Sequence, residues 1–211
     1  MSSSSATASP VQIFSPEDKP YGLSYEEHIQ NFWRWQISIP GRPKSEHPMF
    51  DKTGAKWSKR QSHPKLPVIY LSGAGGRKVH RKCTIPPDKS ILIPVMTMVA
   101  TDSEYPNSTK DLDDIAREDQ DNVNDLSLNI NGKEYTLADL NKFRNHTSNF
   151  EVIYPEGGIF GVSKAGRSKA VADGYYLLTK PLAPDRYTIR FKGTIPSIKF
   201  EEDINYTLIA K

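Results

Sequence analysis

The sequence predicts a mainly β protein, a β-sandwich or jelly roll preceded by one aromatic helix. Three observations predict this class. After residue 66, apolar residues alternate with polar ones in short runs, as they do in half-buried strands. Gly, Pro, Asn and Asp separate about eight such runs, which is typical of sandwiches and rolls. Ahead of them, residues 24–40 repeat with a helical period instead.

Both ends of the aromatic helix can be located from the sequence. Ser24 and Glu27 form a capping box, in which the hydroxyl and the carboxylate satisfy backbone amides of the first turn. Pro40 ends the helix because a proline disfavours the helical conformation of the residue before it. At about 100° per residue, one side of the helix forms a buried arc of Tyr25, His28, Ile29, Phe32, Trp33 and Trp35. Arg34 faces away from this arc.

Gln36 is the polar exception, because it falls near the centre of this arc. A buried glutamine needs partners at both ends of its amide. It is therefore either a structural bridge or a residue that lines a site, and the sequence leaves both open. We interpret the helix first as a fold determinant wedged against the sandwich.

Three segments after the aromatic helix are predicted to be strands. Residues 67–72 form a short apolar run, and residues 79–85 alternate with Arg81 and Cys83 on the inner side. Residues 91–100 are the most hydrophobic run. Pro94 lies within it and predicts an edge position or a bulge, because proline cannot donate to the ladder.

A helical insertion is predicted near residues 110–145. A helix from about 110 to 122 would be capped by Ser108 or Thr109, and a short helix near 137–144 by Thr136. Asn131-Gly132 predicts a hairpin turn between these two helices. The last third returns to strands at these runs: 150–154, 159–162, 170–178, 187–191 and 204–208.

Length and composition indicate one domain. The 211 residues suffice for a sizeable core, and we assign residues 22–211 to a single β-rich domain after a disordered arm, residues 1–21. No apolar run approaches the ~18 residues of a membrane span. The sole cysteine, Cys83, excludes an intramolecular disulfide, and its strand-like surroundings predict a buried thiol.

The small net charge of +3 conceals a strong segregation. Residues 41–89 hold twelve basic against three acidic residues, and residues 101–125 hold two basic against nine acidic residues. This segregation can drive homo-oligomer formation through the two oppositely charged segments. Alternatively, the two segments fold against each other or are simply solvated, and the sequence leaves both interpretations open.

Several segments together carry a resemblance to a known family. They are Gly22-Leu-Ser-Tyr25, residues 32–40, Cys83-Thr-Ile-Pro86 and Ala172-Asp-Gly-Tyr-Tyr-Leu-Leu178 with the strands that follow. The pattern resembles an uncharacterised family of small prokaryotic, often exported proteins over about residues 22–208. The resemblance implies the fold and the extent of the domain, and no catalytic residue. No signal peptide is visible, so the expected location is cytoplasmic by default, or extracellular as in the exported relatives.

Other motifs point away from several function classes. The five histidines are scattered, so we expect no metal site and no cofactor. Gly73-Ala-Gly-Gly76 could cradle a phosphate but lacks the ending of a P-loop, and a flexible hairpin is the preferred interpretation. Arg77, Lys78, Arg81 and Lys82 cluster, yet with so small a net charge we do not expect nucleic-acid binding.

Two function classes remain. The preferred one is a non-catalytic protein that binds a small molecule or glycan, or that self-assembles; its candidate binding residues are Trp33, Trp35, Gln36 and Tyr175. The alternative is a hydrolase-like or metal-assisted enzyme whose polar site forms where loops converge. Its candidate catalytic residues are His28, Asp102, Glu104 and Asp173, with Asp102 or Glu104 as general base and His28 as proton carrier.

Overall fold

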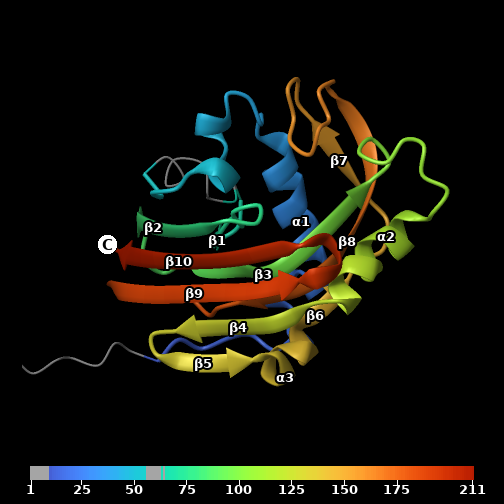
Figure 1. Cartoon of the computed structure of the whole chain (residues 1–211). Helices are drawn as coiled ribbons and strands as arrows, with labels where there is room; N and C mark the ends of the chain where they lie inside the picture. Colours follow the sequence, from blue (N-terminus) through green and yellow to red (C-terminus); the bar gives the residue numbers. More distant parts are fainter. Residues whose placement is uncertain (1–9, 56–62, 64) are drawn as a thin grey trace, which may run out of the picture.

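The computed structural model describes residues 10–55, 63 and 65–211. Within these residues the chain forms ten strands in two five-stranded mixed sheets, with three α-helices (Figure 1). The predicted mainly β class with an N-terminal helix is therefore confirmed. No helix in this part of the chain combines the length and the hydropathy that crossing a bilayer requires.

The first sheet, here called the inner sheet, has its two central strands buried on both faces. β3 and β8 are buried over nearly their whole lengths, which explains why both read as continuous apolar runs rather than alternating ones. β1 pairs with β3 in parallel, and the other pairs are antiparallel. The strands are β1 (Val68–Tyr70), β3 (Ser90–Thr101), β8 (Gly166–Leu178), β6 (Arg144–His146) and β7 (Phe150–Tyr154), the last two both pairing with β8.

The second sheet, the outer sheet, shows one face to the core and one to solvent. Along β9, Tyr187, Ile189 and Phe191 are buried and the residues between them are exposed, as the alternation predicts. β2 pairs with β10 in parallel, and the other pairs are antiparallel. The strand order is β2 (Lys78–Ile85), β10 (Phe200–Ala210), β9 (Asp185–Ile195), β4 (Asn124–Ile130) and β5 (Lys133–Thr136).

The two sheets approach closely where β3 faces β9 and β4. A Cβ built on Gly193 would lie 2.8 Å from Cε of Met96 and 2.9 Å from Cδ1 of Leu126. A side chain at position 193 would therefore displace the ends of the Met96 and Leu126 side chains. The glycine allows Met96 to pack directly onto the backbone of the outer sheet.

The aromatic helix α1 (Tyr25–Ser38) has the predicted start and the predicted buried face. Ser24 N donates to Oε2 of Glu27 at 2.7 Å, and Glu27 N donates to Oγ of Ser24 at 3.2 Å, which completes the capping box. Arg34 is exposed and Trp35 is half-buried. The residues of α1 that are buried are Tyr25, His28, Ile29, Phe32, Trp33, Gln36 and Ile37.

The helical insertion is present, with two corrections. α2 (Leu112–Asp121) begins after Asp111 instead of Ser108 or Thr109, because the Ser108 hydroxyl accepts from Lys110 N at 3.1 Å and closes a turn ahead of the helix. α3 (Leu137–Leu140) has the predicted cap at Thr136 and continues as the 3₁₀ helix Asn141–Phe143, so the predicted helix ends one residue early, before Arg144 of β6.

The predicted hairpin turn forms, and one predicted strand does not. The hairpin between β4 and β5 turns at Asn131 and Gly132, which have φ values of 50° and 87°. Residues 159–162, predicted as a strand, form turns between β7 and β8 instead. Short 3₁₀ helices occupy Pro20–Gly22, Lys44–Glu46, Pro48–Phe50, Asn141–Phe143 and Pro196–Ile198.

Pro94 marks a bulge, as predicted, at a point where β3 pairs with β8 on one side and has no β1 partner on the other. The register between β3 and β8 shifts between Pro94 and Met96. Opposite the bulge, Gly174 has a φ of 151°, and a Cβ there would lie 2.5 Å from the carbonyl oxygen of Met96. The glycine lets the two backbones approach at the irregularity.

The described part of the predicted arm lies against the inner sheet. Phe14 N donates to the carbonyl of Leu178 at 2.9 Å, and Lys180 N donates to that of Gln12 at 2.8 Å. The Tyr25 hydroxyl donates to the carbonyl of Phe14 at 2.9 Å. Residues from 10 onward therefore run along the end of β8, while residues 1–9 lie outside the described residues.

Candidate functional site

A cavity of about 150 Å³ lies beside β3, between α1 and the start of β10. Its position follows from the strand pairing. β1 pairs with β3 only from Ser90 to Leu92, so the same edge of β3 from Ile93 to Thr101 has no partner strand in the described chain. Side chains of α1 and the loop after β1 line the cavity together with residues 96–99 at this edge of β3.

The walls of the cavity are mainly apolar. Aromatic rings and thioethers supply most of the lining, with the edge of β3 along one side. Phe32 and Trp33 come from α1, Phe160 from the β7–β8 connection and Phe200 from β10; the sulfur-bearing side chains are Met49, Met96 and Met98. A cavity of this size and character holds a molecule about as large as benzene.

Trp33 is fixed in the wall by a hydrogen bond to the inner sheet. Its indole Nε1 donates to the Tyr176 hydroxyl at 2.7 Å, with both side chains buried. Phe32 packs edge-on to the Trp33 ring, with the ring centroids 5.1 Å apart. Trp33 was predicted as a binding residue, and it does line the cavity.

Gln36 fits both interpretations that the sequence left open. Its Nε2 donates to Oγ of Ser72 at 3.1 Å, and Ser72 Oγ lies 3.2 Å from Oε1 of Gln36. This pair joins α1 to the loop after β1. Gln36 also lines the cavity, so it is a structural bridge and a lining residue at once.

Glu104 is the first of two carboxyls at the cavity, and its side chain is half-buried. The turn after β3 positions it, since Glu104 N donates to the Thr101 carbonyl at 3.1 Å and to its Oγ1 at 3.2 Å. Its Oε2 is buried and has no hydrogen-bond partner among the described residues. Burial raises the pKa of Glu104 to about 7, because a carboxylate loses solvation in apolar surroundings.

Glu202 is the second carboxyl, and the sequence analysis did not select it. It is 5% exposed, and its Oε2 accepts from Ala74 N at 2.7 Å and from Gly76 N at 3.4 Å. Burial raises the pKa of Glu202, and these amide donors oppose the rise. The glycine-rich loop considered for phosphate binding therefore gives its amides to a carboxylate of the same chain.

Arg81 holds that loop from the other side. Its guanidinium is fully buried and donates to carbonyls of Ser72 at 2.6 Å and of Asp51 at 2.6 Å, and to the Tyr206 hydroxyl. All its nitrogens are bonded to the protein. This arginine is thus structural and unavailable to an outside ligand.

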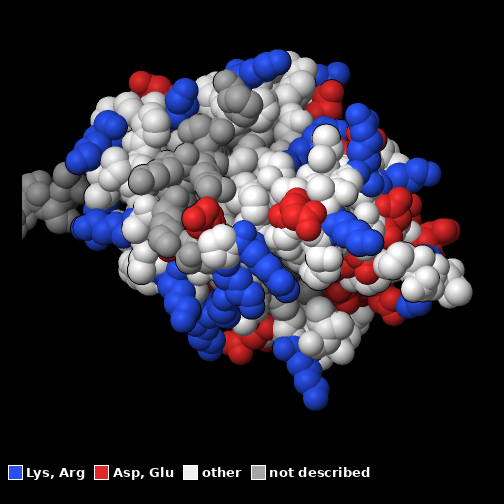
Figure 2. All heavy atoms as spheres, turned by 90° about the horizontal axis from the view of Figure 1, so that it is seen from above, with Lys and Arg blue, Asp and Glu red and all other residues white. Residues whose placement is uncertain are grey.

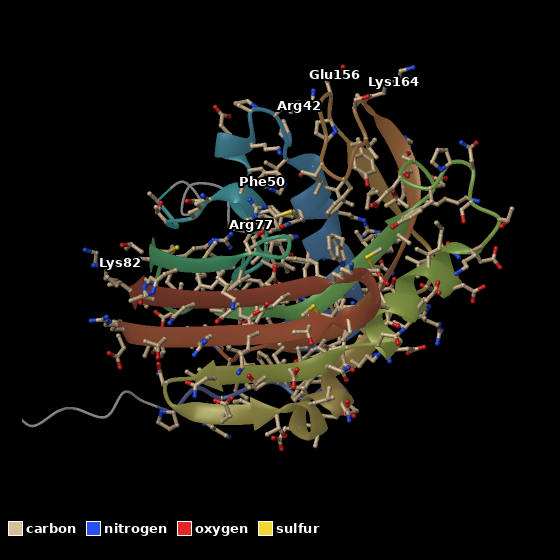
Figure 3. The ribbon with its side chains drawn as sticks, in the orientation of Figure 1. Arg42, Phe50, Arg77, Lys82, Glu156 and Lys164 are labelled. Carbon is tan, nitrogen blue, oxygen red and sulfur yellow. The ribbon has the colours of Figure 1, made fainter. Side chains whose placement is uncertain are left out.

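The basic residues that cluster in the sequence around Arg81 point in different directions in the structure (Figure 3). The Arg77 guanidinium lies over the Phe50 ring at 5.0 Å, while Lys82 is exposed on the outer face of β2. The buried Arg81 lies between them in sequence and faces the core. The three side chains therefore do not form one basic surface.

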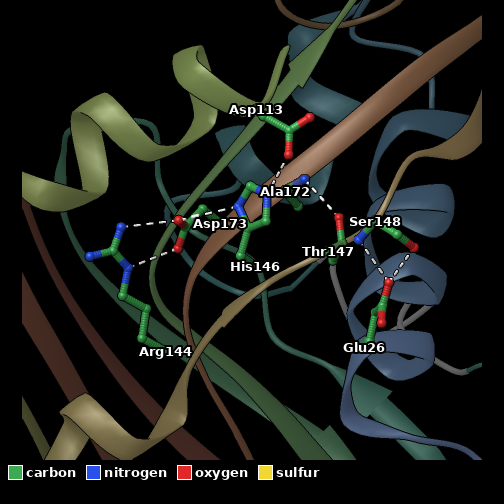
Figure 4. Close-up of polar contacts among 8 residues, drawn as sticks. All are labelled: Glu26, Asp113, Arg144, His146, Thr147, Ser148, Ala172 and Asp173. Carbon is green, nitrogen blue, oxygen red and sulfur yellow. Dashed lines mark hydrogen bonds and ion pairs between the residues drawn. The ribbon is translucent and has the colours of Figure 1, made fainter. Parts of the chain in front are cut away.

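Asp173 lies on β8 in a separate polar cluster (Figure 4), and Tyr175 lies two residues further along the same strand; neither residue lines the cavity. Arg144 donates to both carboxylate oxygens of Asp173 at 3.0 Å. His146 lies beside it, with Nδ1 3.4 Å from Asp173 Oδ2 and Nε2 2.7 Å from Asp113 Oδ1. The cluster attaches α2 to β6 and β8, and Tyr175 pairs with Arg144 in the ladder.

His28 and Asp102 have partners elsewhere. Nε2 of His28 donates to the Pro20 carbonyl at 2.9 Å, and burial lowers the pKa of this histidine. Asp102 accepts from the Ser168 hydroxyl and from Lys169 N at 3.1 Å. Among the four candidate catalytic residues, Glu104 alone lines the cavity. The proposed transfer from a carboxylate to His28 has no support in this geometry.

Trp35 also lies outside the lining. Its ring packs on Tyr70 with centroids 5.2 Å apart and on Phe32 with centroids 5.8 Å apart, so it belongs to the aromatic core below the cavity. Among the described residues, no three or more His, Cys, Asp or Glu side chains are grouped as metal ligands would be. Cys83 is buried as predicted, and burial raises its pKa to about 12.

Acidic side chains gather on the right of the view from above, the side on which α2 lies, while basic side chains are spread over this face and lie on the right as well (Figure 2). None of the ion pairs found within the described ranges joins residues 41–89 to residues 101–125. Self-association through these segments stays a prediction.

Comparison of the chain with protein-family models, with curated proteins and with solved structures gives no match. The family resemblance in the sequence therefore stays a prediction.

Proposed function

We propose that the protein is a non-catalytic binding protein that holds a compact, mainly apolar small molecule in the cavity beside β3. The observation that carries the proposal is a preformed cavity of about 150 Å³ with aromatic and thioether walls and few polar groups. Ligand sites have this composition, with a small number of placed polar groups that orient the ligand.

The construction of the wall supports binding rather than imperfect packing. Trp33 is held by Tyr176 at 2.7 Å, and Gln36 by Ser72 at 3.1 Å, so two lining residues are fixed before a ligand arrives. A pre-organised wall lowers the entropic cost of binding. Methionine thioethers adapt to the shape of different apolar ligands.

Benzene provides the direct test, because a dry cavity of this volume admits it. The full chain is unfolded with urea in the presence and absence of benzene. A ligand that binds only the folded state raises the free energy of unfolding in proportion to the logarithm of its concentration. We expect this logarithmic increase for the wild type and its loss in Val99→Phe, in which the larger ring occupies the cavity.

Ala170→Val is the matched control, because this buried β8 position gains bulk without touching the cavity. It should retain the benzene dependence. An unfolding free energy of the wild type that does not change with benzene would overturn the proposal. A dependence that is unchanged in a folded Val99→Phe variant would do the same, because the benzene would then be bound elsewhere.

A further inference from the structure

Both ionisable groups that line the cavity are acids. Glu104 and Glu202 line it together, and the described lining residues include no lysine, arginine or histidine. A buried negative charge is costly unless an opposite charge or hydrogen-bond donors compensate it. For one of the two carboxyls, that compensation is missing within the described chain.

Glu202 is compensated and Glu104 is not. The amides of Ala74 and Gly76 donate to Glu202, and the buried Arg81 guanidinium lies close enough to favour its ionised form. Glu104 has a buried Oε2 without a partner. Its backbone is hydrogen-bonded, so the turn presents the carboxyl at the cavity without satisfying it.

The remaining wall suits a cation. The rings of Trp33, Phe160 and Phe200 line the same space as Glu104, and aromatic faces attract positively charged groups. An ammonium group would supply the missing donor to Oε2 of Glu104, and its alkyl part would contact the rings and thioethers. The volume limits the ligand to about the size of benzene.

We propose that the ligand is a compact organic cation of the alkylammonium class, with its charged head against Glu104 and its apolar body against the aromatic wall. This inference rests on the proposed binding function and specifies its ligand. The chemistry requires a donor on the ligand, since a carboxylate offers only acceptors.

The test compares two probes of nearly the same shape on the full chain. tert-Butylamine is protonated at pH 8.5, and tert-butanol is neutral. Isothermal titration should show that the amine binds at least about tenfold more tightly, about 1.4 kcal/mol. Tighter or equal binding of the alcohol would overturn the cation assignment, and this comparison requires no variant.

Glu104→Gln then locates the charge, because it keeps the shape of the side chain. We expect the affinity for the amine to fall at least about tenfold while that for the alcohol stays within about twofold. Glu201→Gln is the control on β10, since Glu201 is exposed and paired with Lys78; it should change neither affinity. Amine binding that is unchanged in Glu104→Gln would contradict the inference.

The benzene experiment distinguishes failure of the proposed binding function from failure of the proposed cationic ligand class. If benzene binds and the amine shows no preference, the cavity is a ligand site and the cationic class is wrong. If neither benzene nor either probe binds the wild type, the binding function fails and the cationic ligand fails with it.

Discussion

The indole nitrogen of Trp33 lies 2.7 Å from the Tyr176 hydroxyl and joins α1 to the centre of the inner sheet. Both side chains are buried, so neither polar group has water as an alternative partner. This hydrogen bond fixes the cavity wall. Its strength can be measured without a ligand.

A double-mutant cycle with Trp33→Phe and Tyr176→Phe measures this bond. Each single change leaves a buried polar atom without its partner, whereas the double change removes both. We expect a coupling of about 1 kcal/mol in the free energy of urea unfolding. Single effects that add to within about 0.3 kcal/mol would show that the bond does not stabilise the fold.

Glu104 should make stability depend on pH. Its folded-state pKa of about 7 lies above the ordinary glutamate value of 4.5, so the folded protein binds the proton more tightly than the unfolded chain does. The stability gained from this group is complete below about pH 4.5 and is lost as the pH rises through about 7. At about 1.4 kcal/mol per pKa unit, the loss approaches ~3 kcal/mol.

Glu104→Gln removes this titration. Urea unfolding at pH 5 and pH 8 should therefore show a smaller decrease in stability for the variant than for the wild type. Glu202 also titrates with a raised pKa, but it is present in both proteins and cancels in the difference. If both proteins lost the same stability over this range, Glu104 would not be the titrating group.

Arg81 should be one of the most sensitive positions of the fold. Arg81→Met keeps an apolar stem but removes the donors to the carbonyls of Asp51 and Ser72 and the cation near Glu202. We expect a loss of about 3–5 kcal/mol in the free energy of unfolding. Lys82→Met, an exposed neighbour on β2, should change it by less than about 0.5 kcal/mol. Equal effects of the two variants would contradict the structural role.

The Asp173 cluster should hold α2 in place. Asp173→Asn weakens both bonds to Arg144 and removes the charge beside His146, so we expect a loss of about 2 kcal/mol. Hydrogen exchange of α2 amides should become faster. Asp203→Asn, whose partner Arg190 is half-exposed, should cost less than about 1 kcal/mol and leave α2 unchanged. Unchanged exchange in Asp173→Asn would show that α2 is held by other contacts.

Local signals predicted the elements well. The capping box at Ser24 and Glu27 located the start of α1, and Asn131-Gly132 located a hairpin, because both depend on backbone groups within a few residues. The N-cap of α2 was predicted wrongly because Ser108, Thr109 and Asp111 lie close together in the sequence and each can act as a cap. Ser108, one of the two predicted caps, closes a turn instead.

The site was predicted only in part. Trp33, Gln36 and Glu104 line the cavity, but Asp173 lies in the cluster under α2, since the sequence does not show which loops converge. Glu202 was missed although a signal existed: it is in phase with the buried Ile204 and Tyr206 on the same strand. A carboxylate at an inward position marks a polar site.

The most direct test of the account follows the methyl groups of the three cavity methionines, Met49, Met96 and Met98, by NMR while tert-butylamine is added. We predict saturable shifts of all three signals with one common dissociation constant, and their absence in Val99→Phe. Signals that do not shift, or that shift equally in the folded Val99→Phe variant, would contradict an alkylammonium site beside β3.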